Sequence, residues 1–468
     1  MGFSANDHFA LQLSVCIVVI NPKEKFMATN GLLDASSVRT VRTNLTWERK
    51  PSGDYRAAPR EIMFLVRTGC WRLILAVVIV SGASVGQSPI PTKFTIAGGK
   101  SSTTLPFELI DNRVFLEVHL NGQGRFHFIL DTGANGFSLT DATVQTLGLK
   151  AEDAGEGSGV GEKTVHISRC RLAQAQLGDL RFADLEAEVF PGGDASNVFG
   201  TKPFDGVVGL ELFQHVVVKH DYVRKVLTFT LPDKFNYRGT GLIVPFDRPR
   251  QIPVIDAELD GIRGKFGVDT GARSSLLLYT PFVDQNHLRE KYSAHLEGVT
   301  GWGIGGPVRS LLARAEELKI GNVVVRDLVV RLSTQKQGLT TSPAMAGLIG
   351  PDVLSQFDVI FDYSRRRMIL EKNSQYGRRD SYDRAGLWMG QRGKHFVAID
   401  VIAGGPAAVA GVQQGDTILA IDGTDTAKLV LPDVRENIRR GPVGKKMTLL
   451  LDSAGKRHSV VFKLRDLV

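Results

Sequence analysis

The tetrapeptide Asp-Thr-Gly-Ala occurs twice in this chain, at residues 131–134 and 269–272. Each copy follows a run of apolar residues, as expected for a turn that leaves a buried strand. Burial disfavours the charged form of a carboxyl group, so an aspartate at such a turn is costly unless it has a partner. Two such sites in one chain predict two carboxylates that share one proton. That arrangement can activate water for attack on a peptide carbonyl.

The two copies lie within matching units of the sequence. An apolar Gly-containing box follows at 206–210 and at 347–350, beginning 75 and 78 residues after the respective aspartate. An Asp-Tyr pair comes 15 residues after the start of each box, at 221–222 and 362–363. Ordered matches at near-equal spacing indicate an internal duplication. A single Asp-Thr-Gly would be explained more simply as an Asx-type turn, but two copies in matched repeats favour a paired site.

Both units are predicted to be rich in β-structure. Segments of β-branched and aromatic residues, separated by Gly, Asn or Asp, include 114–120, 126–130, 216–218, 226–229, 323–330 and 368–370. Asn121-Gly122 and Asp260-Gly261 are residue pairs typical of two-residue hairpin turns, and each lies just before an aspartate-bearing strand. The charged run at 363–367 matches 222–225 and predicts a solvated hairpin tip, with a functional basic patch as the alternative.

With these motifs and spacings, residues 93–372 resemble the aspartic peptidases, and most closely the retropepsin-like type. The hydrophobic-hydrophobic-Gly element of that family is present at 207–209 and 348–350. The resemblance implies a mainly β fold with two duplicated β-barrel-like lobes, at 93–236 and 237–372, that face each other across a cleft. Each lobe would supply one catalytic carboxylate, so no second chain is needed to complete the site.

The resemblance implies that Asp131 and Asp269 are the catalytic residues. One acts as a base toward a bound water and the other donates a proton to the scissile carbonyl oxygen, with the two roles left unassigned. Four neighbours are expected to support them: Thr132 and Thr270 by hydrogen bonds across the pair, and Gly133 and Gly271 by letting backbone amides approach the carboxylates.

Two further features bear on the chemistry. Ala134 and Ala272 stand where the pepsin-like pattern often has Ser or Thr, so no hydroxyl there can stabilise an ionised aspartate. We therefore expect activity in mild acid, and an optimum below about pH 3 would contradict this reasoning. Gly-rich segments at 157–161 and 301–306 are predicted to be the tips of mobile hairpins over the cleft. The expected flap and substrate residues are Gly159, Val160, Gly161, Trp302, Gly303 and Ile304, with Trp302 either lining a subsite or packing under its own hairpin.

After a polar stretch at 373–383, predicted to be a linker, residues 384–468 resemble a bacterial PDZ domain. The pattern is carried by 404–412 and 414–423, with Gly405 in place of the usual Ser. Such domains bind an extended peptide by adding it to a sheet edge, which we expect at 395–401 opposite a helix at 433–440. The peptide-binding loop would contain Gly386, Leu387, Trp388 and Met389. Trp388 departs from the small residue usual there, and a structural or autoinhibitory role is the alternative.

Residues 63–86 combine a basic flank, a short apolar core and a small-residue exit, which is the pattern of a secretory signal peptide. The core is short for a membrane span, and an uncleaved anchor is the alternative. We expect translation to begin near Met63, so that residues 1–62 are a non-native or disordered extension. The expected location is therefore outside the cytoplasm, either periplasmic or secreted.

The bulk composition excludes several classes of protein. The chain has 468 residues, 43% of them hydrophobic and 23% charged, which is typical of a soluble protein with more than one domain. Of the net charge of +8, the first 86 residues carry +4 (10 Lys and Arg minus 6 Asp and Glu), and the scattered +4 that remains does not predict a nucleic-acid-binding groove. Beyond residue 86 the only cysteine is Cys170, and no Cys or His cluster has zinc-ligand spacing.

The sequence thus predicts an exported aspartic endopeptidase with an appended peptide-binding PDZ domain. It is expected to act as a monomer on peptide or protein substrates, without a cofactor, a metal or nucleic acid. Two rival functions stay open. One is a peptide-binding scaffold whose duplicated lobes no longer cleave, and the other is an enzyme that processes one dedicated partner.

Overall fold

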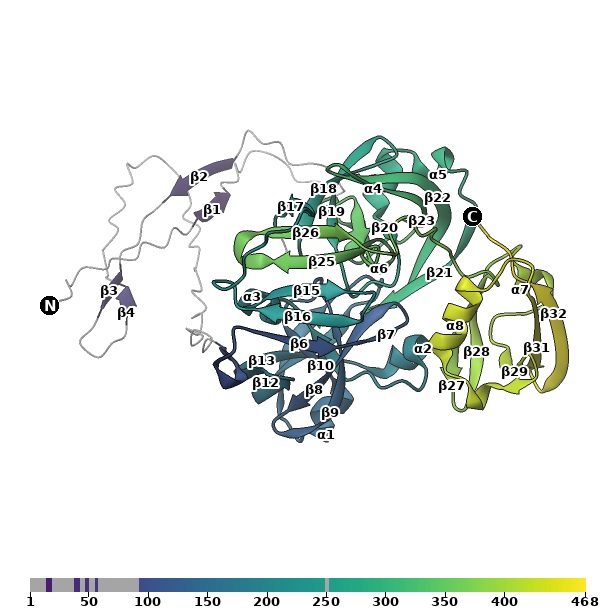
Figure 1. Ribbon diagram of the computed structural model, residues 1–468, viewed down its shortest axis with the longest axis horizontal. Coiled ribbons are helices and arrows are strands. Elements are labelled where there is room, and N and C mark those ends of the chain that lie inside the picture. Colours follow the sequence, from purple (N-terminus) through teal and green to yellow (C-terminus); the bar gives the residue numbers. More distant parts are fainter. Residues whose placement is uncertain (1–13, 19–37, 43–46, 50–54, 58–91, 249–251) are drawn as a thin grey trace, which may run out of the picture. The chain divides into compact units, whose positions relative to one another are not determined.

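The computed structural model describes residues 92–248 and 252–468, together with four short strands nearer the N-terminus (Figure 1). The chain divides into two compact units, Met1–Gly86 and Gln87–Val468. In the first unit, β1 (Ser14–Val18) pairs with β2 (Val38–Arg42) and β3 (Trp47–Arg49) with β4 (Tyr55–Ala57). The predicted signal segment at 63–86 and most of the predicted extension at 1–62 lie outside the described residues. No helix in the described part of the chain is long and apolar enough to cross a bilayer.

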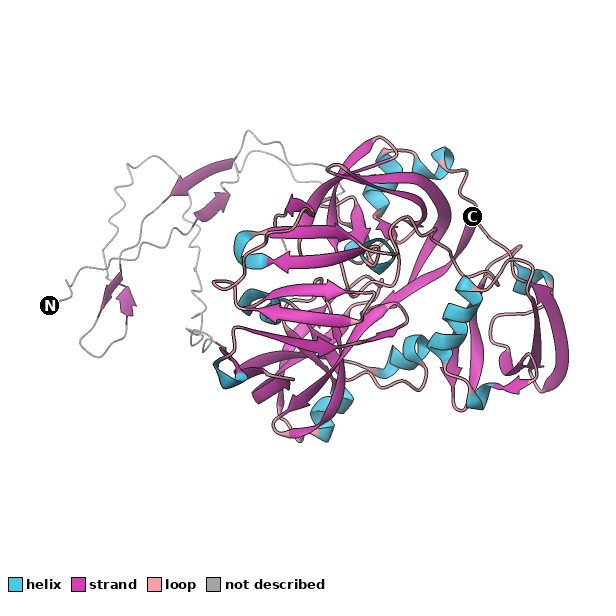
Figure 2. Ribbon diagram, in the orientation of Figure 1, coloured by secondary structure: helices cyan, strands magenta, loops and turns pink. Residues whose placement is uncertain are grey.

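Strands dominate the second unit, which confirms the predicted mainly β fold (Figure 2). The first lobe is built on one sheet in the order β11-β12-β13-β10-β14-β9-β8-β7, with β5 added to β13. A further pairing of β8 with β12 curls this sheet into a barrel-like form. Its strands are β5 (Lys93–Ile96), β7 (Glu108–Ile110), β8 (Arg113–Leu120), β9 (Gln123–Leu130), β10 (Phe137–Thr140), β11 (Ala151–Gly157), β12 (Val165–Leu177), β13 (Leu180–Phe190) and β14 (Gly206–Val208).

The helical segments of the first lobe are short. They are η2 (Ala97–Gly99), α1 (Asp141–Thr146), η3 (Gly193–Ala195), α2 (Ser196–Phe199) and α3 (Leu210–His215).

The second lobe repeats this plan. Its sheet runs β18-β19-β24-β20-β23-β22-β21, again with an extra pairing, of β18 with β22. The strands are β18 (Val254–Leu259), β19 (Ile262–Val268), β20 (Leu276–Leu278), β21 (Leu296–Gly303), β22 (Gly306–Ile320), β23 (Val323–Ser333) and β24 (Gly347–Ile349). The helical segments are α4 (Thr280–Gln285), α5 (Leu288–Lys291), η4 (Leu339–Thr341) and α6 (Pro351–Leu354).

Strand pairing confirms the duplication predicted from the sequence. In the first lobe β14 runs parallel to β9, and β10 is antiparallel to β14 and parallel to β13. In the second lobe β24, β19, β20 and β23 pair in the same directions. The predicted hairpin turns are also confirmed, because Asn121 and Gly122 have φ of 51° and 75°, and Asp260 and Gly261 have φ of 46° and 83°. Positive φ at both central positions is the signature of a type I′ turn.

A third sheet joins the two lobes. Its order is β17-β26-β25-β15-β16-β6, and β15 of the first lobe pairs antiparallel with β25 of the second. The strands are β6 (Ser102–Pro106), β15 (Val217–Asp221), β16 (Val226–Thr230), β17 (Leu242–Pro245), β25 (Phe357–Asp362) and β26 (Arg367–Lys372), with η5 (Tyr363–Arg365) at the β25–β26 turn.

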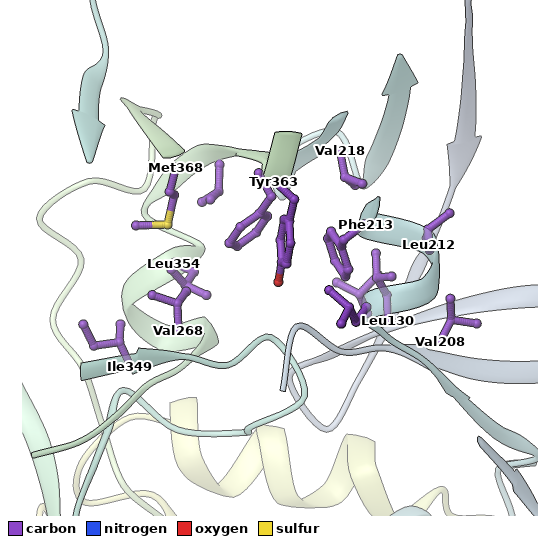
Figure 3. Packing of buried hydrophobic residues seen from close by; sticks show 14 of the residues in the cluster. Leu130, Val208, Leu212, Phe213, Val218, Val268, Ile349, Leu354, Tyr363 and Met368 are labelled. Carbon is purple, nitrogen blue, oxygen red and sulfur yellow. The ribbon is translucent and has the colours of Figure 1, made fainter. Parts of the chain in front are cut away.

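One hydrophobic core extends through both lobes, and its middle lies where the lobes meet (Figure 3). Phe213 of the first lobe stacks on Tyr363 of the second, with ring centroids 5.1 Å apart. Leu130 and Val268, the residues just before the two Asp-Thr-Gly turns, are fully buried in this core. The predicted hairpin tip at 363–367 is a turn in which Tyr363 is buried in the core, while Ser364, Arg365 and Arg366 are exposed. Because the lobes share one core, the ends of β9 and β19 are held rigidly relative to each other.

The C-terminal domain has its own core and its own sheet, in the order β27-β28-β29-β31-β32 with β30 added to β29. Its elements are β27 (Leu387–Arg392), β28 (His395–Val401), α7 (Pro406–Val409), β29 (Thr417–Ile421), β30 (Thr424–Asp425), η6 (Thr426–Lys428), α8 (Leu431–Arg440), β31 (Lys446–Ser453) and β32 (Lys456–Lys463). The strand predicted at 417–421 has those bounds, and the predicted helix begins two residues earlier than expected. Residues 373–383 form no helix or strand, yet Asp380 and Tyr382 within them are buried against the second lobe.

Candidate active site

Asp131 and Asp269 lie at the ends of β9 and β19, where each strand leaves the core of its lobe and enters a turn. The backbone N–H of Asp131 donates to the carbonyl of Val208 at 2.9 Å, and that of Asp269 donates to Ile349 at 2.9 Å. The apolar Gly boxes recognised in the sequence therefore form the strands, β14 and β24, that hold the two turns in place. Since the pairing is the same in both lobes, the turns present their aspartates symmetrically.

The two carboxyl groups lie side by side, since a Cβ added to Gly133 would lie 3.1 Å from Oδ1 of Asp131 and 3.3 Å from Cγ of Asp269; we call this pair the dyad. Their backbone environments differ. Asp131 Oδ1 accepts one N–H, from Gly133 at 2.6 Å, whereas Asp269 Oδ1 accepts two, from Gly271 and Ala272, both at 2.9 Å. Each N–H bonded to a carboxylate favours its ionised form. Asp269 is therefore better prepared than Asp131 to carry the negative charge.

Burial and the neighbouring Asp269 carboxyl raise the pKa of Asp131 well above its ordinary value. The pKa of Asp269 is also raised by burial, while its hydrogen bonds oppose the shift. The positive charge of Arg113 lowers the pKa of both groups. Two adjacent carboxylates in such a site cannot easily both ionise, so the dyad retains one proton between them.

The two threonines hold the turns together in a closed set of hydrogen bonds. Thr132 Oγ1 donates to the Val268 carbonyl at 2.6 Å and accepts from the Thr270 N–H at 3.1 Å. In the equivalent pair of bonds from the other lobe, Thr270 Oγ1 donates to the Leu130 carbonyl at 2.9 Å and accepts from the Thr132 N–H at 3.0 Å. Both threonines are fully buried. The hydroxyls thus tie each turn to the strand of the opposite lobe.

The glycines of the two turns are required by space. A Cβ added to Gly271 would lie 2.3 Å from Cγ of Asp131, and one added to Gly133 would lie 3.3 Å from Cγ of Asp269. Each glycine therefore lies against the carboxyl group of the opposite lobe. This geometry agrees with the expectation that Gly lets backbone amides approach the carboxylates. At Gly271 the contact with the opposite lobe leaves no room for a side chain.

The dyad opens into a cavity of about 520 Å³. Five of the six predicted flap and substrate residues line it: Gly159, Val160, Trp302, Gly303 and Ile304. Gly161 instead contacts the opposite hairpin, where its N–H donates to the Ile304 carbonyl at 3.0 Å, and Lys163 N–H donates to the Gly305 carbonyl at 3.1 Å. The two hairpin tips are therefore bonded to each other over the cavity.

Each hairpin tip places one apolar side chain in a pocket of the opposite lobe. Val160, from the first lobe, packs against a second-lobe pocket of Ile252, Val254, Leu277, Tyr279, Val308 and Leu348. Trp302, from the second lobe, packs against a first-lobe pocket of Ile110, Phe115, Ile129, Val198 and Phe199. Of the two alternatives for Trp302, the structure shows the side chain lining the cavity, where it packs against the first lobe.

Sequence reasoning missed a buried ionic cluster beside the dyad. Arg113 lines the cavity, donates from Nε to the Gly271 carbonyl at 2.7 Å and pairs with Asp111 at 2.6 Å. Asp111 also pairs with Arg273 at 3.0 Å and lies 3.7 Å from Arg435 of the C-terminal domain. The available signal was the charged stretch at 111–113 inside an otherwise apolar strand region, because charges so placed are rarely buried unless paired.

In the C-terminal domain, the prediction that 395–401 forms the free sheet edge is wrong. β28 is paired on both sides, with β27 and with β29, so β27 is the edge strand and lies beside α8. Both strands are apolar and buried, and such patterns do not encode which strand lies outermost. The predicted binding residues Gly386, Leu387, Trp388 and Met389 therefore lie at the start of the edge strand and in the loop before it.

That loop is already engaged within the chain. The N–H groups of Ala385 and Leu387 donate to Oδ1 of Asp383 at 3.0 and 3.2 Å, and burial raises the pKa of Asp383. Trp388 is buried between two guanidinium groups, with Arg435 4.3 Å and Arg273 5.3 Å from its ring centroid. The large side chain that departs from the usual loop pattern thus packs against the peptidase lobes.

Among the described residues, no cluster of three or more His, Cys, Asp or Glu side chains could hold a metal ion. Cys170 is a buried free thiol on β12, away from the dyad, and burial raises its pKa to about 11.

Two protein families match this chain. The aspartyl protease family matches residues 116–212, from β8 to α3, which includes Asp131 and its box at 206–210. The PDZ domain family matches residues 397–452. No curated protein matches the chain.

The class of molecule defined by the fold is therefore a two-lobed aspartyl protease domain of the retropepsin-like type followed by a PDZ domain. The second lobe lies beyond the matched segment and is assigned to the same fold by its identical strand pairing. Both kinds of domain generally bind peptides or proteins.

Proposed function

We propose that this protein is an aspartic endopeptidase that hydrolyses peptide bonds with a water molecule activated by Asp131 and Asp269. The observation that carries the proposal is the dyad: two carboxyl groups, one from each lobe, lie side by side and line one cavity, and the pKa of each is raised. A pair that holds one proton supplies a general base and a general acid at the same place.

We assign the base to Asp269 and the acid to Asp131. The two N–H groups bonded to Asp269 favour its ionised form, and the stronger upward pKa shift at Asp131 keeps the proton there. Asp269 then takes a proton from water, the water oxygen bonds to the carbonyl carbon, and Asp131 gives its proton to the carbonyl oxygen. As the resulting diol collapses, one hydroxyl proton returns to Asp131, Asp269 protonates the amine, and the C–N bond breaks.

The cavity supports an extended peptide with apolar residues on both sides of the cleaved bond. The cavity that contains the dyad has apolar lining from both lobes: Ile129, Val198, Phe199 and Phe204 from the first, and Ile252, Leu277, Tyr279, Val308 and Leu348 from the second. Burying an apolar side chain in such a pocket contributes roughly 1.5–3 kcal/mol. A peptide with apolar residues at these two positions would be bound with its scissile carbonyl near the dyad.

The test is cleavage of a peptide library by the full chain at several pH values, read by mass spectrometry. The variants Asp131→Asn and Asp269→Asn should each abolish cleavage. A matched control is Asp233→Asn, an exposed first-lobe aspartate whose carboxylate pairs with the adjacent Lys234. Cleavage that survives either dyad substitution would refute the assignment. A library that binds saturably but stays intact would instead support the rival scaffold function.

We also propose that the protein is exported, as a periplasmic or secreted enzyme. The alternative is that the apolar segment is not cleaved and anchors the protein in the membrane. Support comes from the basic, apolar and small-residue pattern at 63–86. Mass spectrometry of the mature N-terminus tests this: a terminus close to residue 86 supports export with cleavage, and one before residue 60 contradicts it. We expect the enzyme to be monomeric because one chain supplies both carboxylates.

A further inference from the structure

Helix α2 of the first lobe lies in the groove of the PDZ domain. It contacts both walls of that groove, the edge strand β27 and the helix α8 (Figure 1). A Cβ added to Gly200, at the end of α2, would lie 2.8 Å from Cβ of Leu431 on α8, and one added to Gly390 on β27 would lie 2.9 Å from Oδ1 of Asn197. The place where PDZ domains add a peptide strand is therefore filled by a segment of this chain.

A single arginine of α8 fastens this contact. Arg435 donates from Nη1 to the Val198 carbonyl at 2.8 Å, and from Nη2 to the Asn197 carbonyl at 2.8 Å and the Met389 carbonyl at 2.5 Å. Carbonyl groups in the last turn of a helix have no partner within that helix, so Arg435 satisfies two such groups of α2. The side chain is 3% exposed, and it also takes up the Met389 carbonyl on the edge strand. The planar guanidinium can make this three-way contact, which a lysine cannot reproduce.

The other face of α2 is part of the substrate cavity. Val198 and Phe199 belong to the first-lobe pocket beneath Trp302, and both line the cavity that contains the dyad. Phe199 packs edge-on against Phe115, with ring centroids 5.2 Å apart, and the guanidinium of Arg113 lies 5.5 Å from its ring. The same four-residue helix thus presents its side chains to the substrate pocket and its carbonyl groups to the PDZ domain.

From these contacts we propose that Arg435 is a positioning residue for peptide hydrolysis: the PDZ groove holds α2 in place, and α2 sets the shape of the first-lobe substrate pocket. This inference rests on the proposed peptidase function. The PDZ domain is then a fixed wall of the active site, and its groove is occupied within the chain. Removal of Arg435 leaves three carbonyl groups, those of Asn197, Val198 and Met389, without this donor and lets Val198 and Phe199 move out of the pocket.

The kinetic test uses peptides derived from one cleaved library sequence, with Phe or Ala at each of the two positions that flank the cleaved bond. In Arg435→Met, the ratio of kcat/KM for Phe over Ala should fall about tenfold at one of these positions, through KM, because a pocket that has lost its wall distinguishes side-chain size poorly. The ratio at the other position, which contacts the second lobe, should stay within about twofold.

The matched control is Arg379→Met, which removes an arginine that bridges Asp327 of the second lobe and Asp466 near the C-terminus without touching α2. It should leave both ratios unchanged. A second variant, Gly200→Ala, keeps Arg435 but forces a methyl group against Leu431, and should shift the same ratio as Arg435→Met. Gly200→Ala decides the matter if Arg435→Met does not fold. Unchanged ratios in the folded variants, or an equal shift in Arg379→Met, would overturn the proposal.

Hydrogen exchange gives a readout that does not need cleavage. Amide exchange in residues 196–205 should accelerate at least about tenfold in Arg435→Met and Gly200→Ala, since exchange reports local opening, and should not change in Arg379→Met. If the unaltered protein cleaves no peptide, the peptidase function fails and the exchange rates alone judge the role of Arg435. Equal rates in this segment for all proteins would then refute it.

Discussion

The crossed threonine network offers a sharp test of how the two lobes are held in register at the dyad. Replacing Thr132 by Val keeps the size and shape of the side chain but removes its hydroxyl. The Val268 carbonyl then loses the donor at 2.6 Å, and the Thr270 N–H loses the acceptor at 3.1 Å. Val268, Thr270 and Thr132 itself are all fully buried, so water cannot easily replace the missing hydroxyl.

The expected loss of stability follows from these two groups. A buried donor or acceptor left without a partner costs about 1–3 kcal/mol, so Thr132→Val should lower the free energy of unfolding by about 2–6 kcal/mol. Thr132→Ser retains the hydroxyl and removes one methyl group, which costs about 1 kcal/mol. By the symmetry of the network, Thr270→Val should lose about as much stability as Thr132→Val, because the Thr132 N–H and the Leu130 carbonyl lose their hydrogen-bond partner.

The measurement is urea unfolding followed by far-UV circular dichroism, at one pH, for the original protein and the three variants. Both Val variants should also lose kcat, because the two turns that carry the dyad are no longer tied across the lobes. If Thr132→Val were no less stable than Thr132→Ser, within about 0.5 kcal/mol, the hydrogen bonds would not contribute as the geometry implies.

Three more predictions concern the dyad and the cavity. The pKa of Asp131 is raised in the folded state, so the folded protein keeps a proton that the unfolded chain releases, and the free energy of unfolding falls as pH rises above the ordinary pKa of Asp. In urea titrations from pH 4.5 to 7.5, the free energy of unfolding of Asp131→Asn should rise relative to the original protein by about 1.4 kcal/mol per pH unit, up to the folded pKa. Parallel curves for the two proteins would contradict this. Gly271→Ala forces a methyl group onto the Asp131 carboxyl and should lower kcat about 100-fold. Gly136→Ala, just after the first Asp-Thr-Gly turn, adds a methyl group that meets no atom within 4 Å and should leave kcat unchanged. Equal kcat values for the two variants would refute the close contact. Gly161→Ala places a Cβ 2.2 Å from the carbonyl carbon of Gly305 and should raise KM about tenfold by separating the hairpin tips. Gly193→Ala, where an added Cβ meets no atom within 4 Å, is the control, and equal KM values for the two variants would argue against closure by these tips.

Much of the fold could be predicted from the sequence because the duplication repeats its signals. The Asp-Thr-Gly turns, the apolar Gly boxes and the Asn-Gly and Asp-Gly pairs are local features with strong backbone requirements. Each appears twice at matching distances, so the two halves support each other. The dyad itself followed from the same features, since two aspartates at equivalent positions of a duplicated fold are brought together by its pseudo-symmetry.

The contacts across domain boundaries could not be predicted in this way. Three sets of contacts join residues far apart in the chain. They are the packing of Val160 and Trp302 against opposite lobes, the ion pairs of Asp111 with Arg273 and Arg435, and the contact of α2 with the PDZ groove. Alternating apolar patterns specify that a face is buried but not what it is buried against. The wrong choice of edge strand in the PDZ domain has the same origin, because β27 and β28 are both buried and only their partners differ.

Trp388 is a local signal that points beyond its own domain, as the charged stretch at 111–113 also does. At a position where the PDZ pattern has a small residue, a large aromatic side chain needs a surface to cover it, and Arg435 of its own domain lies 4.3 Å from its ring centroid. A second guanidinium over the ring belongs to Arg273 of the second lobe, the residue directly after the second Asp-Thr-Gly-Ala. Arg273 and Arg435 in turn both lie beside Asp111 of the first lobe. A peptide tail entering this loop would have to displace Trp388 and disturb the arginine next to the Asp269 turn. The residue that departs from the PDZ pattern therefore joins Arg435 in linking the PDZ domain to the lobe that carries Asp269.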